Sequence, residues 1–470
     1  MNLFPLCYAN DNDALVPELW AQESLAILEE NMVMANLVHR DFSPLVASYG
    51  DVVNTRRPGE FKMRRKAQTD SVENQDAVAT NVQVPLNQHV YVTFTIYDEE
   101  SSLAFKDLVT FYMQPAALEM ARAVDKILLG QVHRFLANKA GKLAGMTSAT
   151  AKDDILAARE VMNVNKAYVS GRNLVVGPQS ETNILATELF IAANQRGDGG
   201  TALENARMGR ILGFDTYMDQ HVPYRALLTA DTRTLNHATG AAAGATGNIA
   251  MTATGLVTVG EFVWFTGDQQ PQIIAAETNG GANLTGMTLV DAYKNAVAAN
   301  AVGYAFNKCL VDLAGHTGVT AYPAGYDKKI RLDGITANKQ PVAGQLLAFS
   351  TTTTRHTYTI LQVEIVDATT VYVWLDRPLV TAIVNNEVAF PGPHGAMNFA
   401  FHRDALALVS RPLAVPNRAL GVQSAVGVYN DLAMRVAMQY DITTQGTRVT
   451  LDMLLGVALL DVNLGCVLLG

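Results

Sequence analysis

The chain has 470 residues, enough for about three domains at roughly 150 residues each. It carries 35 Lys and Arg against 44 Asp and Glu, and this net charge of -9 argues against a protein whose whole surface attracts a polyanion such as nucleic acid. Charged residues make up only 17% of the chain, below the roughly 25% of ordinary soluble domains, and 49% of residues are apolar, so we expect other chains to cover much of the surface.

The N-terminal part predicts a short polar arm followed by one amphipathic helix. We expect the helix from Pro17 to about Val38, because Leu25, Leu28 and Met32 recur at helical spacing and a proline suits the first turn. The residues before it lack the basic start and the long apolar run of a signal peptide.

Residues 50–100 change to the period of strands. "GDVVNTRR" and "EFKMRRKAQ" predict two strands with a turn at Pro58 and Gly59, and "HVYVTFTIY" predicts a third strand with alternating apolar residues. The polar stretch "TDSVENQDAVA" separates them. We therefore expect a long extended excursion that needs another surface to lie on.

The clearest helical pattern is "QPAALEMARAVDKILLGQVHRFLANKAG". Pro115 opens it, an apolar stripe follows one side, and Gly141 is a plausible end, which predicts a helix of ~26 residues and ~39 Å. Glu119 and Asp125 are expected on the opposite, exposed face. Gly130 within the helix is a candidate point of bending.

Residues 150–221 alternate between helical and strand patterns. "AKDDILAAREVMN" and "SETNILATELFIAA" predict helices, "RNLVVGP" predicts a short buried strand, and "GRILGFDTYMDQHV" predicts a strand pair around Gly213. This alternation favours an α/β unit.

Residues 222–395 are rich in Thr, Gly, Ala and Val and have few helical patterns. "GLVTVGEFVWFTG" at 255–267 and "QPVAGQLLAFST" at 340–351 are weakly alike, since each has a Val/Gly turn before an apolar strand. The composition predicts an inserted β-rich domain, either a small barrel or a sandwich.

The last part of the chain predicts strands that complete the fold begun before residue 222. "SAVGVYNDLAMRVAMQYD" and "TRVTLDMLLGVALL" read as long strands. The apolar C-terminal "LDMLLGVALLDVNLGCVLLG" contains Asp452 and Asp461, which would be costly inside a bilayer, so we expect buried strands and no membrane contact.

The sequence offers no constellation of catalytic or metal-ligating residues. It has no GxxxxGK[ST] loop, no HExxH motif and no GxSxG elbow. "HRD" at His402–Asp404 lacks the trailing Asn of a kinase loop, and "DND" at Asp11–Asp13 lacks the later Gly and Glu of a calcium loop. Cys309 is read as a buried structural thiol, and three widely spaced cysteines favour a reducing compartment. We expect no enzyme activity, no cofactor and no metal.

The order of these parts resembles that of the major capsid proteins of tailed bacteriophages, which share the Hong Kong 97-type fold. "NFAFHRDALALVSRPL" is similar to the "FHRDA…A…RPL" segment of podovirus-type coat proteins, "QPAALEMARAVDKILLG" resembles the start of their spine helix, and "NLVVGP" resembles a strand of their axial domain. The likeness spans nearly the whole chain apart from the insertion. It implies an α+β fold with these parts: N-terminal arm and helix (1–49), extended E-loop (50–100), spine helix of the peripheral domain (101–149), first part of the axial domain (150–221), inserted β-rich domain (222–395), and return strands of the axial and peripheral domains (396–470).

The resemblance also implies a function and a set of partners. The chain would self-assemble as hexamers and pentamers into the icosahedral head shell, which encloses double-stranded DNA without sequence-specific binding. A separate scaffolding protein, the portal and, in some members, a decoration protein are the other expected partners. Assembly would take place in the host bacterial cytoplasm, and the finished protein would reside in the virion. No cleaved N-terminal scaffolding segment is expected, because the first helix begins so early.

A concentrated basic segment, "RRPGEFKMRRK", lies in the expected E-loop. Its basic residues are Arg56, Arg57, Lys62, Arg64, Arg65 and Lys66. Three roles stay open: docking onto an acidic surface of a neighbouring subunit, a solvated edge that opposes aggregation, and contact with nucleic acid. Docking is favoured, because Phe61 alone is available there for stacking on bases. The candidate acidic partners are Glu119, Asp125, Asp98, Glu99 and Glu100.

Two other functions compete with the shell subunit. A different virion or surface protein, such as an adhesin with a β-rich binding domain, would explain residues 222–395 but not the long helix. An enzyme of unrecognised type would need a polar constellation that the spacing does not show.

Overall fold

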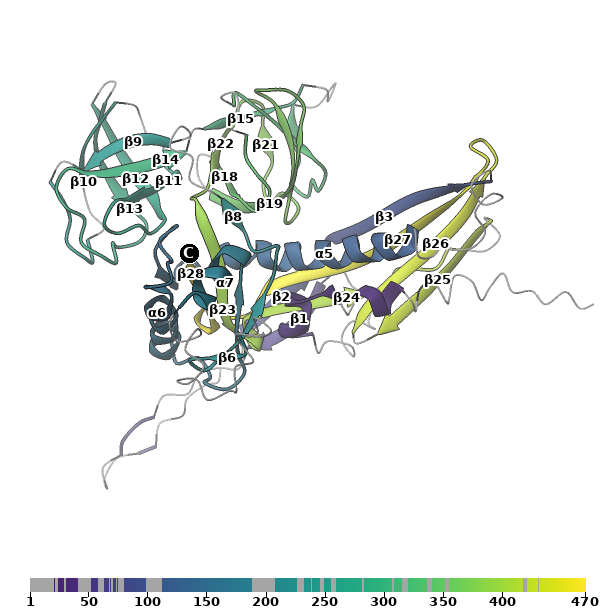
Figure 1. Ribbon diagram of the computed structural model, residues 1–470, viewed down its shortest axis with the longest axis horizontal. Coiled ribbons are helices and arrows are strands. Elements are labelled where there is room, and N and C mark those ends of the chain that lie inside the picture. Colours follow the sequence, from purple (N-terminus) through teal and green to yellow (C-terminus); the bar gives the residue numbers. More distant parts are fainter. Residues whose placement is uncertain are drawn as a thin grey trace, which may run out of the picture. The chain divides into compact units, whose positions relative to one another are not determined.

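The structure is a computed structural model with two compact units (Figure 1). It describes residues 21, 24–28, 31–40, 52–57, 63–66, 68, 71–72, 74, 80–98, 112–187, 208–225, 232–237, 239–245, 249–254, 259–280, 283–306, 308–314, 320–335, 340–350, 355–416, 421–429 and 431–470. Unit 1 comprises Met1–Met32, His39–Val124 and Leu406–Leu460, and unit 2 comprises Val33–Val38, Asp125–Ala405 and Asp461–Gly470.

Unit 1 contains a five-stranded antiparallel sheet. Its strands are β3 (Gln88–Tyr97), β24 (Leu406–Arg411), β25 (Val422–Tyr429), β26 (Leu432–Asp441) and β27 (Gly446–Leu459). The long β27 pairs with β3 along one edge and, along the other, with β26 near its start and β24 near its end. The long strands expected near the C-terminus are confirmed.

Asp452 lies in β27 and is only 3% exposed. Its carboxylate accepts a hydrogen bond from Arg435 Nε at 3.0 Å and lies 3.3 Å from His89 Nε2, so the buried charge is compensated. The residue that made a membrane segment implausible is therefore part of a buried strand.

A separate two-stranded ribbon is formed by β1 (Val52–Arg57) and β2 (Thr80–Pro85). The register runs from Val52 opposite Pro85 to Arg57 opposite Thr80. Val84 anchors its base, since this side chain is buried in a cluster with Ala407, Val409 and Ala458. The ribbon is thus fixed at one end to the sheet of unit 1.

Two expectations for residues 50–100 are corrected. The described residues 63–66 of "EFKMRRKAQ" form no strand, and β1 pairs with β2 instead. The third strand, β3, joins the sheet because its alternating apolar side can pack there, so the two-stranded excursion is confined to 52–85.

Helix α5 (Gln114–Gly130) has 17 residues, so the expected helix of ~26 residues is too long. A 3₁₀ turn at Val132–Phe135 and the strand β4 (Lys139–Gly141) follow it. The apolar pattern continued beyond Gly130 because these later residues are also buried, although they are not α-helical. The N-terminal helical pattern is likewise interrupted at Met32 and Val33, before the short α2 (Met34–Leu37).

Unit 2 contains a mixed sheet with the strand order β4-β28-β23-β5-β7-β6, and β8 pairs with β23. The remaining bounds are β5 (Arg172–Val176), β6 (Arg210–Ile211), β7 (Phe214–Met218), β8 (Tyr224–Arg225), β23 (Gly395–His402) and β28 (Gly465–Leu469), with helices α6 (Ala151–Val164) and α7 (Pro178–Leu185). The α/β alternation is confirmed, including the β6–β7 pair around Gly213, whose φ of 92° suits glycine.

Two closed β-barrels, also in unit 2, occupy most of residues 232–391. The first barrel consists of β9 (Thr232–His237), β10 (Ile249–Thr254), β11 (Phe262–Phe265), β12 (Gln272–Gly280), β13 (Asn283–Leu289) and β14 (Ala301–Phe306). The second consists of β15 (Cys309–Asp312), β17 (Ile330–Asp333), β18 (Leu346–Ser350), β19 (Arg355–Ile365), β20 (Val371–Leu375) and β22 (Val388–Pro391). A separate two-stranded sheet is formed by β16 (Ala321–Tyr322) and β21 (Ile383–Val384). The β-rich character is as expected, but the segment holds two barrels rather than one.

The segment with both barrels begins and ends at one place in the mixed sheet. Arg225 of β8 lies opposite Gly395 of β23 in an antiparallel pair. The chain therefore leaves the mixed sheet after β8, builds both barrels and returns in β23, beside its point of departure.

Two cysteines lie in separate cores of unit 2. Cys309 is buried in the second barrel and Cys466 in the mixed sheet. Cys309 is 3% exposed, as expected for a buried thiol, and burial raises the pKa of each of the two thiols to about 12. No helix in the described part of the chain is long and apolar enough to cross a membrane.

Candidate subunit interface

The outer part of the β1–β2 ribbon is exposed. Every residue that the structure describes between the two strands is in the exposed class, including Met63 at 86% and Val72 at 82%.

The basic residues lie at or beyond the outer end of this ribbon. Arg56 and Arg57 end β1, opposite Asn81 and Thr80. Arg64, Arg65 and Lys66 are exposed in the connection between the strands, and Lys62 lies outside the described residues. Arg56 and Arg57 thus lie in a strand, as expected, whereas the strand expected at 63–66 is wrong.

Two of the candidate acidic partners are exposed. Glu119 lies 3.3 Å from Arg122 on the surface of α5, and Asp98 accepts a hydrogen bond of 2.7 Å from the Tyr440 hydroxyl. Glu99 and Glu100 lie outside the described residues. A basic arm could meet Glu119 or Asp98, but each already has a polar neighbour that would have to share it.

The expected position of Asp125 on the exposed face of the helix is wrong. Its side chain is 2% exposed and accepts hydrogen bonds from Val33 N at 2.8 Å and Ala35 N at 3.2 Å. Burial, with the nearby Asp219, raises the pKa of Asp125 to about 7. A sequence signal existed, because Ala121 and Leu128, which flank Asp125 on the same helix face, are apolar.

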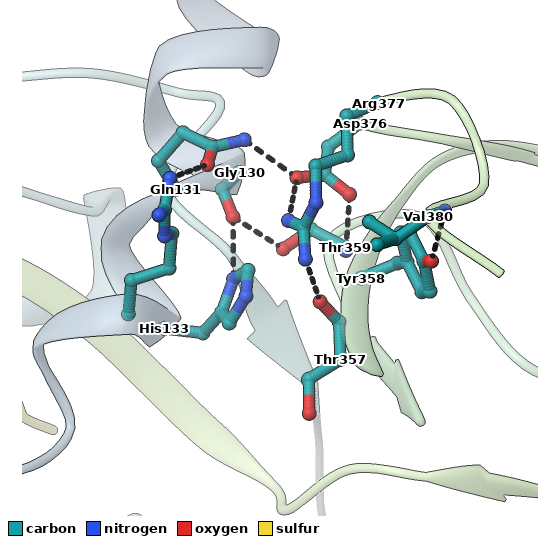
Figure 2. Close-up of polar contacts among 10 residues, drawn as sticks. Gly130, Gln131, His133, Thr357, Tyr358, Thr359, Asp376, Arg377 and Val380 are labelled. Carbon is teal, nitrogen blue, oxygen red and sulfur yellow. Dashed lines mark hydrogen bonds and ion pairs between the residues drawn. The ribbon is translucent and has the colours of Figure 1, made fainter. Parts of the chain in front are cut away.

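A second polar cluster, which no sequence pattern predicted, lies where α5 ends (Figure 2). The Gly130 carbonyl accepts hydrogen bonds from Thr359 Oγ1 at 2.8 Å and from His133 Nδ1 at 2.7 Å. Gln131 Nε2 donates to Asp376 Oδ2 at 2.7 Å. These contacts hold the end of α5 against the second barrel, and they use the carbonyl of the residue at which the helix ends.

The charged residues of this cluster are strongly influenced by burial. Asp376 is fully buried and its pKa is raised to about 6, although Arg377 and the Thr359 amide favour its charged form. Burial and the positive charge of Arg377 lower the pKa of His133 to about 3, so this imidazole is neutral and donates from Nδ1. The cluster is suited to holding two elements together, since all of these groups are engaged with one another.

The "HRD" motif forms the turn after β23. His402 Nδ1 lies 3.6 Å from Asp404 Oδ2, and the two residues flank Arg403 at the start of a 3₁₀ turn.

Among the residues that the structure describes, no group of three or more His, Cys, Asp or Glu side chains is placed to hold a metal ion.

One open groove on unit 2 has a volume of about 510 Å³. Lys126 and Arg225 contribute charge, while Val342, Leu361 and Ile365 contribute apolar surface. Its lining residues include neither a carboxylate nor a histidine.

Comparisons with known proteins give likenesses among solved structures. A structure from Mycobacterium phage Che8 is similar at 12% identity and a TM-score of 0.45, covering 93% of this chain and 90% of that one. The capsid of the cyanophage P-SCSP1u is similar at 9% identity and 0.44, covering 93% and 88%. The mature capsid of bacteriophage PhiM1 is similar at 9% identity and 0.39, covering 90% and 82%. No protein-family model and no curated protein sequence matches the chain.

Proposed function

We propose that this chain is the major capsid protein of a tailed bacteriophage, with the Hong Kong 97-type fold and nearest in kind to podovirus coat proteins. The chain would form hexamers and pentamers of an icosahedral shell around double-stranded DNA. The order of the sequence elements suggests this reading.

The observation that supports it most is the exposed β1–β2 ribbon. A two-stranded ribbon is marginal in water unless it packs on something, and only the base of this one, at Val84, packs within the described chain. Its outer part presents Met63, Val72 and a row of cations. A second copy of the chain is the partner that fits a shell, because each subunit would then both extend an arm and receive one.

The ribbon corresponds in this proposal to the E-loop. Arg64, Arg65 and Lys66 would dock on an acidic surface of the neighbouring subunit, with Glu119 and Asp98 as the described candidates. Each exposed ion pair contributes only ~0–1 kcal/mol, but repetition over a closed shell fixes the register of the subunits.

The other expected roles follow from the same proposal. A separate scaffolding protein, a portal and, optionally, a decoration protein would complete the assembly in the host cytoplasm, and the product would be part of the virion. The segment 222–395, with its two barrels, would be the insertion and would serve subunit stability or contacts between capsomers.

The proposal is tested by electron microscopy of the full-length chain, produced in bacteria with and without the other head proteins of its phage. We expect closed shells or tubes of regular capsomers. A monodisperse monomer that persists with the scaffolding protein present would overturn the proposal. The adhesin-type alternative would then become the leading one, and the groove beside Lys126 and Arg225 would be the place to seek a ligand.

A further inference from the structure

The two closed barrels of unit 2 have the same strand order. Numbered from one to six along the chain, the strands of the first barrel follow the order one-two-five-four-three-six around the cylinder, and so do those of the second. All neighbouring strands are antiparallel in both.

The likeness extends to single hydrogen bonds. Before the third strand, Gly260 N donates to Ile274 O at 2.9 Å in the first barrel, and Gly344 N donates to Ile360 O at 2.7 Å in the second. The return bonds, Ile274 N to Glu261 O and Ile360 N to Gln345 O, also correspond.

The irregularities of the two barrels correspond as well. Ile274 pairs with Leu289 and Ile360 with Leu375, and in both barrels the register shifts immediately after the isoleucine. Bulges at matching positions are specific features of a strand pair. The third strands are also the two sequence segments that look alike, at 255–267 and 340–351.

The first barrel docks on the stretch that begins with β4. Lys139 Nζ donates to the Pro271 carbonyl at 3.0 Å and lies 3.3 Å from Asp291 Oδ2. Gln270 Nε2 donates to the Gly141 carbonyl, and Leu143 N donates to the Gln269 carbonyl at 2.8 Å. Lys139 is buried, so these contacts exclude water from its ammonium group.

The second barrel docks on the stretch just before it, at the end of α5 (Figure 2). Gln131 donates to Asp376 and Thr359 donates to the Gly130 carbonyl, while the Thr357 carbonyl accepts a hydrogen bond from Arg377 of the same barrel. The fit is close, because a Cβ at Gly130 would lie 2.8 Å from Asp376 Cβ.

The two docking edges are equivalent positions of the barrels. In the first barrel, Gln272 pairs with Val263 of the third strand, and Pro271 directly precedes it. In the second barrel, Tyr358 pairs with Leu347 of the third strand, and Thr357 directly precedes it. Both aspartates lie where the fifth strand ends. Asp291 is the second residue after Leu289, and Asp376 is the first residue after Leu375. Each edge therefore offers a carboxylate after the fifth strand, which receives Lys139 in the first barrel and Gln131 in the second. The carbonyl near the start of the fourth strand accepts from Lys139 in the first barrel and from the barrel's own Arg377 in the second.

We propose that the two barrels are tandem copies of one binding module, and that this shared edge is its binding surface. Its ligand is a polypeptide segment that presents side-chain N–H donors. The stretch from Gly130 to Leu143 supplies this ligand twice in succession, with Gln131 for the second barrel and Lys139 for the first. The inference concerns single chains and stands independently of shell formation.

The test is amide hydrogen exchange, read peptide by peptide on the full-length chain, with the matched variants Gln131→Met and Lys139→Met. Each removes one donor to one edge and keeps a flexible side chain of similar length. For Lys139→Met we expect exchange about tenfold faster in 262–277, with 344–376 unchanged. For Gln131→Met we expect the reverse pattern.

Two further variants keep the test decisive. Lys139→Arg retains a donor and should leave exchange unchanged, which separates a lost contact from a general failure to fold. Lys328→Met removes an exposed cation of the second barrel away from its docking edge and should also have no effect. Equal acceleration of both barrels by either methionine variant, or no change with both, would overturn the shared binding edge. An experimental structure in which Gly260 and Gly344 fail to superpose when the barrels are aligned would overturn the duplication.

Discussion

Asp125 lies in α5 with its carboxylate directed at the N–H groups of Val33 and Ala35. Burial raises its pKa from 3.8 to about 7, so between these values the folded chain binds more protons than the unfolded one. The contribution of protonated Asp125 to the free energy of unfolding is complete below about pH 4 and is lost as the pH rises through 7. The loss is on the order of 4 kcal/mol at most.

We therefore expect Asp125→Asn to remove part of the fall in stability between pH 5 and pH 8. The measurement is the urea midpoint of both proteins at the two pH values, with the exposed Asp327→Asn as the control. Asp376, whose pKa is raised to about 6, acts in the same direction. His133 acts oppositely, because its lowered pKa gives stability that is lost as the pH falls below 6.5. The contributions of Asp376 and His133 are the same in the variant and in the unchanged chain, so they cancel in the comparison. An unaltered pH dependence of the variant's stability would contradict the role of Asp125.

Gly130 has a role that only a residue without a side chain can fill. A Cβ there would lie 2.8 Å from Asp376 Cβ, closer than such atoms approach in proteins. We expect Gly130→Ala to destabilise the chain by ~1–3 kcal/mol and Gly130→Val to cost more, as measured by thermal unfolding. Alanine favours an isolated helix by ~1 kcal/mol, so a stabilised alanine variant would show that the close approach does not exist.

At the scale of single elements, the β1–β2 ribbon is the feature that assembly should depend on. We expect Arg64→Glu with Arg65→Glu to raise the concentration needed for shell formation about tenfold, because two favourable contacts become repulsive in each subunit. Sedimentation of assembled against unassembled protein measures this. Lys328→Glu, the matching reversal at an exposed cation of the second barrel, should assemble normally. Equal impairment of both variants would point to a general effect of charge.

Helices and strands with a regular apolar period could be predicted from the sequence. β3, α6, β5 and the strands after residue 396 were predictable, because their apolar residues follow a clear period. The end of α5 could not be predicted, because the hydrogen bond to the Gly130 carbonyl comes from Thr359, which is far along the chain. The apolar neighbours Ala121 and Leu128 signalled the buried face of Asp125, but its distant partners, the N–H groups of Val33 and Ala35, could not be predicted. Propensity carries no information about such distant partners.

At the scale of the whole molecule, composition predicted the β-rich segment but not its division into two barrels. Their weak mutual likeness at 255–267 and 340–351 was visible, and only the shared pairing register shows that it marks equivalent strands. Closure of each barrel removes its edge strands. The ribbon, by contrast, leaves its strands open to contact, which is consistent with a chain that joins others through an arm.

The two buried thiols provide natural reporters for the order in which unit 2 opens. Cys309 lies in the second barrel and Cys466 in the mixed sheet, and with pKa values raised to about 12 neither should react with an alkylating reagent at pH 8 while its core is closed. Pulsed alkylation during slow heating, followed by mass analysis of the two peptides, would time the opening of each core. We expect Gln131→Met to advance the labelling of Cys309 and leave that of Cys466 in place. A variant could thus be assigned to barrel or sheet without a new structure.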